Sequence, residues 1–114
     1  MTTTISSQRR SNSARRCVSA GLRERVDAQQ FAWQLNPSTV RVGVPVAFVT
    51  RSQDVNHGFG IYKGHTFIAQ IQVVPDRNST LIHTFHETGI YTVLCLEFCG
   101  VGHHGMVATF TVTK

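Results

Sequence analysis

Long apolar runs are missing from this 114-residue chain. A membrane-spanning helix needs about 20 consecutive apolar residues. The longest candidate, residues 42–49, is about half that length and has the composition of a β-strand. The sequence therefore contains no transmembrane segment, and we expect a soluble chain whose membrane association comes only through partners.

Cysteine and acidic residues are also scarce. The three cysteines cannot form a disulfide framework, because Cys17 stands alone while Cys95 and Cys99 form one close pair. Six arginines and one glutamate fall in residues 1–26, whereas residues 27–114 hold five basic and five acidic residues. A neutral domain offers no surface that could follow a phosphate backbone. We therefore expect no nucleic-acid partner and treat Cys17 as an incidental thiol.

The composition changes near residue 28, which we take as the start of the folded domain. Residues 1–27 are rich in Ser, Thr and Arg and lack the apolar region of a secretory signal. They are predicted to form a disordered basic tail or a presequence. Residues 28–114 are predicted to form one domain.

Short β-rich segments separated by turn residues fill residues 28–114. No segment keeps helical periodicity over about ten residues, so no helix is expected. Seven or eight short strands at regular intervals favour an all-β sandwich or barrel. The expected strands are 30–35, 39–42, 45–51, 58–62, 66–74, 79–85, 90–96 and 107–113.

A soft set of metal ligands is concentrated near the C-terminus. A glycine-rich stretch of twelve residues, 95–106, contains four of these ligands: Cys95, Cys99, His103 and Met106. A fifth, His57, lies beside a turn earlier in the chain. Thiolate and thioether groups select copper, and imidazole suits it. Because a sandwich brings the ends of non-adjacent strands together, we expect His57 to meet the loop at one end of the domain.

Several kinds of site could use these residues. Structural zinc usually takes two separated ligand pairs and has no use for Met106. A mononuclear blue-copper centre takes two histidines, one cysteine and an axial methionine, which leaves one thiol spare. A disulfide between Cys95 and Cys99 would leave the other three residues at these spacings by chance. Two bridging thiolates with one imidazole for each of two coppers use every donor, so we favour a dinuclear copper site.

The string Cys-x-Glu-x-Cys-Gly-x-x-His-x-x-Met at residues 95–106, with Asp-Val-Asn-His at 54–57, resembles the CuA domain of cytochrome c oxidase subunit II. The resemblance covers residues 30–114 and implies a Greek-key β-sandwich of the cupredoxin type. It implies that Cys95 and Cys99 bridge two coppers, with His57 and Met106 on one. His103 and the Glu97 carbonyl oxygen would complete the other. The Glu97 side chain would help to hold a magnesium ion at a subunit interface.

The same resemblance implies a function in one-electron transfer. The donor would be a cytochrome c-like protein and the acceptor the catalytic subunit of a terminal oxidase. The domain would lie on the outer, periplasmic or intermembrane-space side of an energised membrane, and would not be an enzyme by itself. An alternative from another class is a copper-binding protein for assembly or storage. Phe31 and Trp33 are the two candidates for the residue that accepts the electron. The sequence favours a core position for Trp33 over a role in electron transfer.

Overall fold

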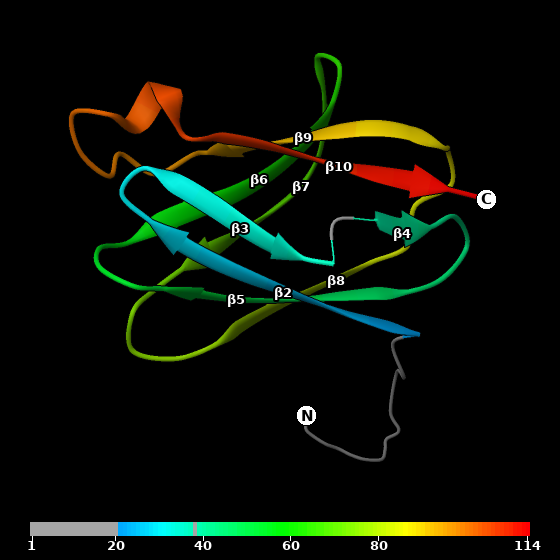
Figure 1. Ribbon diagram of the computed structural model, residues 1–114, viewed down its shortest axis with the longest axis horizontal. Helices are drawn as coiled ribbons and strands as arrows, with labels where there is room; N and C mark the ends of the chain where they lie inside the picture. Colours follow the sequence, from blue (N-terminus) through cyan, green and yellow to red (C-terminus); the bar gives the residue numbers. More distant parts are fainter. Residues whose placement is uncertain (1–20, 38) are drawn as a thin grey trace.

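The chain folds into two β-sheets packed face to face. A computed structural model describes residues 21–37 and 39–114, which form nine strands and one short 3₁₀ helix (Figure 1). No helix within these two ranges is long and apolar enough to cross a bilayer. The strands are β2 (Leu22–Gln29), β3 (Ala32–Asn36), β4 (Thr39–Arg41), β5 (Val46–Ser52), β6 (His57–Lys63), β7 (Thr66–Val73), β8 (Ser79–His83), β9 (Gly89–Cys95) and β10 (Val107–Thr113).

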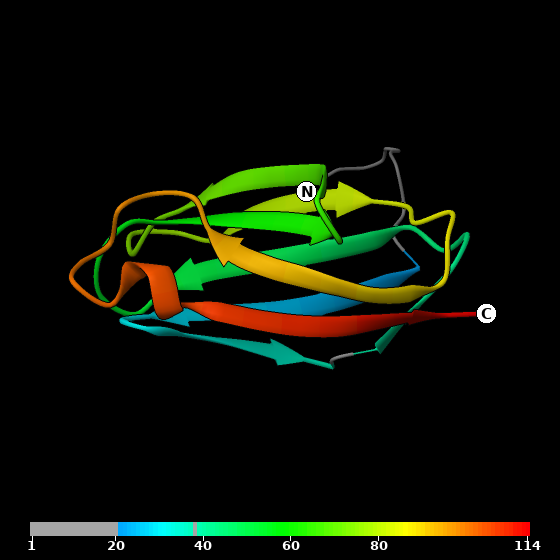
Figure 2. The same cartoon turned by 90° about the horizontal axis from the view of Figure 1, so that it is seen from above.

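The two sheets form distinct layers, one above the other in Figure 1, and Figure 2 looks onto the face of the sandwich, where the strands of the two sheets overlap. One has the strand order β4-β10-β9-β6-β7 and the other β3-β2-β5-β8. Most neighbouring strands are antiparallel, but β2 pairs with β5 and β4 pairs with β10 in parallel. Such order, with neighbours in space that are distant in sequence, makes the fold an all-β Greek-key sandwich, as the sequence predicts.

Inward-facing apolar residues of both sheets fill the space between the layers. In β9 and β10 alternate residues are buried, as expected for a pleated strand with one face on the core, whereas the first five residues of β6 are all buried. The rings of Phe48, Phe59, Phe85 and Phe110 meet there at centroid distances of 5.4–6.1 Å. Each fully buried ring stabilises the fold by roughly 1.5–3 kcal/mol, so this aromatic cluster holds the two layers together.

Strand β2 begins at Leu22, before the domain boundary that the sequence suggests at residue 28. Its inward positions carry Glu24, Val26 and Ala28, all buried. The charged residue interrupts the apolar alternation, and the flanking arginines give the segment the composition of the preceding tail. Residues 1–20, including Cys17, lie outside the described part of the chain, so the nature of the tail stays a prediction.

Candidate metal centre

The start of β6 and the end of β9 lie side by side at one end of the sandwich. Because the two strands are antiparallel neighbours, Phe59 pairs with Cys95, and the backbone N–H of Leu96 donates to the carbonyl of Gly58 at 2.9 Å. His57 is the first residue of β6, one position before the strand expected at residues 58–62, and Cys95 is the last residue of β9. Strand pairing brings these two residues together across 38 positions of sequence.

Residues 96–106 connect β9 to β10 and are called the ligand loop. The loop is the orange segment at the left of Figure 1 and contains the 3₁₀ helix His103–Gly105. It folds back on itself, since the N–H of His103 donates to the carbonyl of Gly100 and that of Met106 to His103. This folding returns Cys99, His103 and Met106 toward Cys95.

The sulfur and nitrogen atoms of these residues form a compact cluster. The Sγ atoms of Cys95 and Cys99 are 3.5 Å apart. Nδ1 of His57 lies 3.8 Å from Sγ of Cys95, and Nδ1 of His103 lies 3.5 Å from Sγ of Cys99. Sδ of Met106 is 3.8 Å from Sγ of Cys99. The Cys95 thiol also donates to the Glu97 carbonyl oxygen at 3.0 Å, so all six predicted residues contribute an atom to the cluster.

These separations suit a shared metal ion. With metal–sulfur bonds of about 2.3 Å and metal–nitrogen bonds of about 2.0 Å, one ion can join a thiolate and an imidazole that are up to about 4.3 Å apart. Both sulfur–nitrogen distances fall below this limit. The ligand atoms of His57, Cys95 and Cys99 all lie within 4.8 Å of one another and are buried. The donor set, thiols with imidazole and thioether, is the kind that copper prefers.

Burial also shapes the acidity of the Cys99 thiol. Burial first, then the hydrogen bond with Cys95 and the negative charges of Cys95 and Asp54, together raise the pKa of Cys99 to about 11. Cys95 and Cys99 are both free of a disulfide and buried. Metal binding at such a pair must release protons, since the thiolate is the ligand.

Asp54 orients the ring of His57. Its carboxylate lies 2.9 Å from Nε2 of His57 and also accepts the backbone N–H groups of Gln30, at 2.7 Å, and Val55, at 2.6 Å. Burial alone would raise the pKa of Asp54, but these hydrogen bonds and the attraction of His57 lower it to about 2. An ionised carboxylate only accepts, so Nε2 of His57 carries a proton, and in the neutral ring Nδ1 faces Cys95 with a free lone pair.

Gln30 joins the two halves of the site. Its backbone N–H donates to Asp54, which holds His57, and its side-chain amide donates to the carbonyl oxygen of Cys99 at 2.7 Å. Neither contact has a signature in the sequence, because both are made across long stretches of chain. Gln30 therefore positions both ligand-bearing segments without being a ligand.

The two aromatic candidates for electron acceptance lie in different surroundings. Trp33 is buried, and its indole N–H donates to the carbonyl oxygen of Met106 at 3.2 Å, which agrees with a core position. Phe31 is partly exposed and its ring lies against the ligand loop, where a Cβ atom on Gly100 or Gly102 would come within 3 Å of it. The loop therefore needs glycine, or at least very little side chain, under Phe31.

Apolar side chains surround the site at the surface. Phe98 is 74% exposed and its ring contacts that of His103 with a centroid distance of 5.7 Å, while Val101 is fully exposed. Phe31 adds to this rim, since its ring lies against Gly100 and Gly102 on either side of Val101, and the Glu97 side chain is also exposed. We call Phe31, Phe98 and Val101 the apolar rim. Such a patch around a buried site is typical of an interaction surface.

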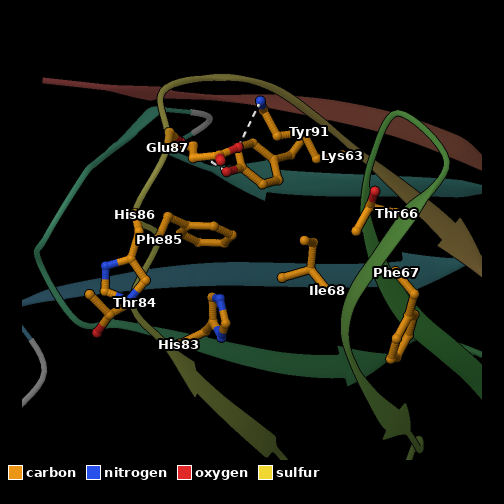
Figure 3. Close-up of a pocket in the computed structure, with 10 residues that line it drawn as sticks. All are labelled: Lys63, Thr66, Phe67, Ile68, His83, Thr84, Phe85, His86, Glu87 and Tyr91. Carbon is orange, nitrogen blue, oxygen red and sulfur yellow. Dashed lines mark hydrogen bonds and ion pairs between the residues drawn. The ribbon is translucent and has the colours of Figure 1, made fainter.

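A cavity lies at the end of the sandwich opposite the cysteines. It has a volume of about 520 Å³, and Figure 3 shows Phe85 and Ile68 projecting into it, with Lys63 paired to Glu87 at 3.1 Å. His83 and His86 also line it, and burial, aided by the charge of His86, lowers the pKa of His83. The cavity adjoins the end of β6 and the start of β9, away from the cysteines, so it takes no part in the metal cluster.

Curated proteins are similar in sequence to this chain. No family model matches the chain. It is 37% identical over 84 residues to cytochrome c oxidase subunit 2 of Thermus thermophilus, a match that covers 74% of this chain and 60% of that protein. A second subunit 2 sequence from the same species matches over 48% of its length. The chain thus spans about half to three fifths of these curated relatives.

Solved structures share the fold. The periplasmic domain of subunit II of cytochrome oxidase from Bradyrhizobium japonicum superposes with a TM-score of 0.73 at 20% identity, covering 83% of this chain and 86% of that domain. A chain of a heme-copper terminal oxidase dimer gives a TM-score of 0.66 at 31% identity, covering 79% and 63%. These matches confirm the predicted cupredoxin-like sandwich.

Proposed function

We propose that this chain, which belongs to the same family as subunit II of cytochrome c oxidase, carries out one-electron transfer through a dinuclear copper centre. The observation that carries the proposal is the pair of thiols 3.5 Å apart, each with a different imidazole nitrogen within 3.8 Å. Two sulfurs shared between two metal ions, with one imidazole for each ion, use every donor of the cluster. A mononuclear blue-copper carrier is the second candidate, but it would leave one thiol unused.

Each residue has a distinct role in this proposal. Cys95 and Cys99 would hold both coppers, with His57 and Met106 as further ligands of one and His103 and the Glu97 carbonyl oxygen as further ligands of the other. Bound there, the coppers would supply a one-electron couple. The protein supplies rigidity, because Asp54 fixes the ring of His57. Burial of both thiols excludes water from the ligands.

The apolar rim is the proposed docking surface for a cytochrome c-like donor. Phe31 lies on this rim and against the ligand loop, so it is the better placed of the two aromatic residues to accept the electron. Trp33 instead holds Met106 from within the core. A surface without excess acidic charge suits an apolar contact better than one steered by charge.

The acceptor in this proposal is the catalytic subunit of a terminal oxidase, so the domain is part of an enzyme complex and is not catalytic alone. The matched domain of B. japonicum is periplasmic, and we propose the corresponding outer side of an energised membrane for this one. The exposed Glu97 carboxylate is free to take part in a magnesium site shared with a partner. An assembly or storage protein remains the contrasting function, distinguished by copper that dissociates readily and shows no reversible one-electron couple.

The test is the copper content and spectrum of the reconstituted full chain. We expect two coppers per chain, a purple oxidised form and a paramagnetic signal from one electron shared by two copper nuclei. His103→Ala should abolish this signal, whereas His104→Ala, which removes the exposed neighbouring imidazole, should preserve it. One copper per chain with an intense blue colour would refute the dinuclear assignment.

A further inference from the structure

Three arginines gather on the outer face of the β3-β2-β5-β8 sheet. Arg23 and Arg25 project from β2, and Arg51 projects from the adjacent β5. They surround a hollow of about 410 Å³ that we call the arginine hollow. Its lining consists of Arg23, Arg25, Asp27, Val49, Arg51 and Asn78.

Strand register produces this grouping. In the parallel β2–β5 pair, Arg25 lies opposite Val49 and Asp27 lies opposite Arg51. Adjacent strands are about 4.8 Å apart, and alternate residues of one strand are about 7 Å apart on the same face. The three guanidinium groups can therefore converge on one ligand, with the side chain of Val49 between them.

The positive charge of the hollow is only partly compensated. Asp27 accepts Nε of Arg25 at 3.1 Å through one oxygen and the side-chain amide of Gln53 at 3.2 Å through the other. Among the described residues, neither Arg23 nor Arg51 has an ion-pair partner. One carboxylate against three guanidinium groups leaves an excess of two positive charges in the hollow.

We propose that the arginine hollow binds a small multivalent oxyanion of the phosphate class. The planar guanidinium group presents paired N–H donors that match two oxygens of a phosphate. A dianionic group would balance the excess charge, and the amide of Asn78 is a further donor at the rim. The volume lies in the range of small-ligand sites, which suits a free phosphate compound better than a flat membrane surface.

Ordinary solvation is the competing explanation for arginines on an exposed sheet face. It would account for their polarity but gives no reason for unpaired like charges on neighbouring strands, which repel one another. Solvation also predicts that each arginine acts only through the net charge of the protein. The two explanations therefore differ in whether position matters.

The experiment titrates the full chain with pyrophosphate at low ionic strength and follows binding by calorimetry and by NMR shifts of β2 and β5. Arg23→Gln with Arg51→Gln should weaken binding by about tenfold or more, because charge-assisted hydrogen bonds are lost. These two arginines make no described ion pair, so their replacement should leave the fold intact. Two matched double variants each remove the same charge elsewhere: Arg15→Gln with Arg16→Gln in the N-terminal segment, and Arg41→Gln with Lys114→Gln.

Retention of binding in both control variants, with shifts confined to the hollow, would establish the site. Equal weakening in the hollow and control variants would overturn it, since only net charge would then matter. Binding weaker than about 1 mM in the unmodified chain would overturn it as well. Association with phosphatidylglycerol vesicles in the absence of pyrophosphate binding would also reject a small-ligand site and assign the arginines to a lipid surface. The outcome is independent of copper, because the hollow shares no residue with the metal cluster.

Discussion

The Asp54 carboxylate lies 2.9 Å from Nε2 of His57, and Nδ1 of the same ring lies 3.8 Å from Sγ of Cys95. One side of the imidazole is thus held by a carboxylate while the other faces a thiol. Metal-binding histidines are commonly oriented in this way, because the outer hydrogen bond selects the tautomer that can coordinate. The consequences of this and other contacts can be measured.

Asp54→Asn should weaken copper binding by about tenfold to a hundredfold. The amide can still hydrogen-bond but no longer compels Nε2 of His57 to carry the proton. Competition against a copper chelator measures the affinity. Asp76→Asn is the control, since Asp76 is an exposed loop acid without a described hydrogen bond. Equal affinities for the two variants would argue against tautomer control by Asp54.

Gln30→Ala should loosen the ligand loop. The change removes the hydrogen bond to the carbonyl oxygen of Cys99 but keeps the backbone contact with Asp54. We expect the free energy of unfolding to fall by about 1 kcal/mol, and amide hydrogen exchange in residues 96–106 to become faster. Gln34→Ala, at an exposed position of β3, is the matched control. If both variants exchange at the rate of the unmodified protein, Gln30 does not position the loop.

Gly102→Ala should destabilise the domain, whereas Gly105→Ala should not. A Cβ atom on Gly102 would approach Cδ2 of Phe31 to 2.5 Å, while one on Gly105 would meet no atom of the described part of the chain within 4 Å. We expect the free energy of unfolding of the Gly102→Ala variant to be lower by about 1–3 kcal/mol, because Phe31 is displaced. The second should change by about 1 kcal/mol at most and in the stabilising direction. Thermal unfolding distinguishes them, and equal midpoints would mean that Phe31 moves without cost.

Met106→Leu should keep copper bound but shift its reduction potential. Met106 is buried with Sδ 3.8 Å from Sγ of Cys99, and leucine has a similar volume. The packing cost should stay below about 1.5 kcal/mol, while the loss of a weak axial donor changes the potential. Voltammetry of the reconstituted protein measures the shift, and an unchanged potential would remove Met106 from the proposed ligands.

The buried Glu24 should make stability fall as pH rises. Among residues 21–37 and 39–114, nothing hydrogen-bonds to either carboxylate oxygen of Glu24, and burial raises the pKa of this group from 4.5 to about 7. The folded state therefore holds the proton that the unfolded state releases. The stabilisation is complete below pH 4.5, declines as pH rises toward 7, and is lost above it. The free energy of unfolding below pH 4.5 should exceed that above pH 7 by about 3 kcal/mol.

Urea unfolding on either side of this range measures the effect. Glu24→Gln and Glu24→Met should each flatten the decline relative to the unmodified protein, because neither side chain titrates. Asp76→Asn should retain it. An identical pH dependence in the unmodified protein and the Glu24 variants would show that other groups cause it.

Local patterns in the sequence account for most of the strands and for the choice of donors. Alternating residues in β10 and turn residues between strands predict the sandwich, because a pleated strand with one buried face leaves that trace. The string from Cys95 to Met106 identifies soft ligands, because metal preference follows from side-chain chemistry. The same grounds predict His57 as the distant donor.

Only the tertiary structure decided the features that depend on long-range pairing. Strand β2 has a charged residue at an inward position, so its alternation is broken, and its parallel partner β5 lies about 24 residues further along the chain. The pairing buries Glu24 and sets Arg23, Arg25 and Arg51 on one face. In the same way, the links from Gln30 to Cys99 and Asp54 exist only once the loops meet. Sequence determined which groups the protein carries, and the fold determined which of them touch, since contacts between distant residues leave no local pattern.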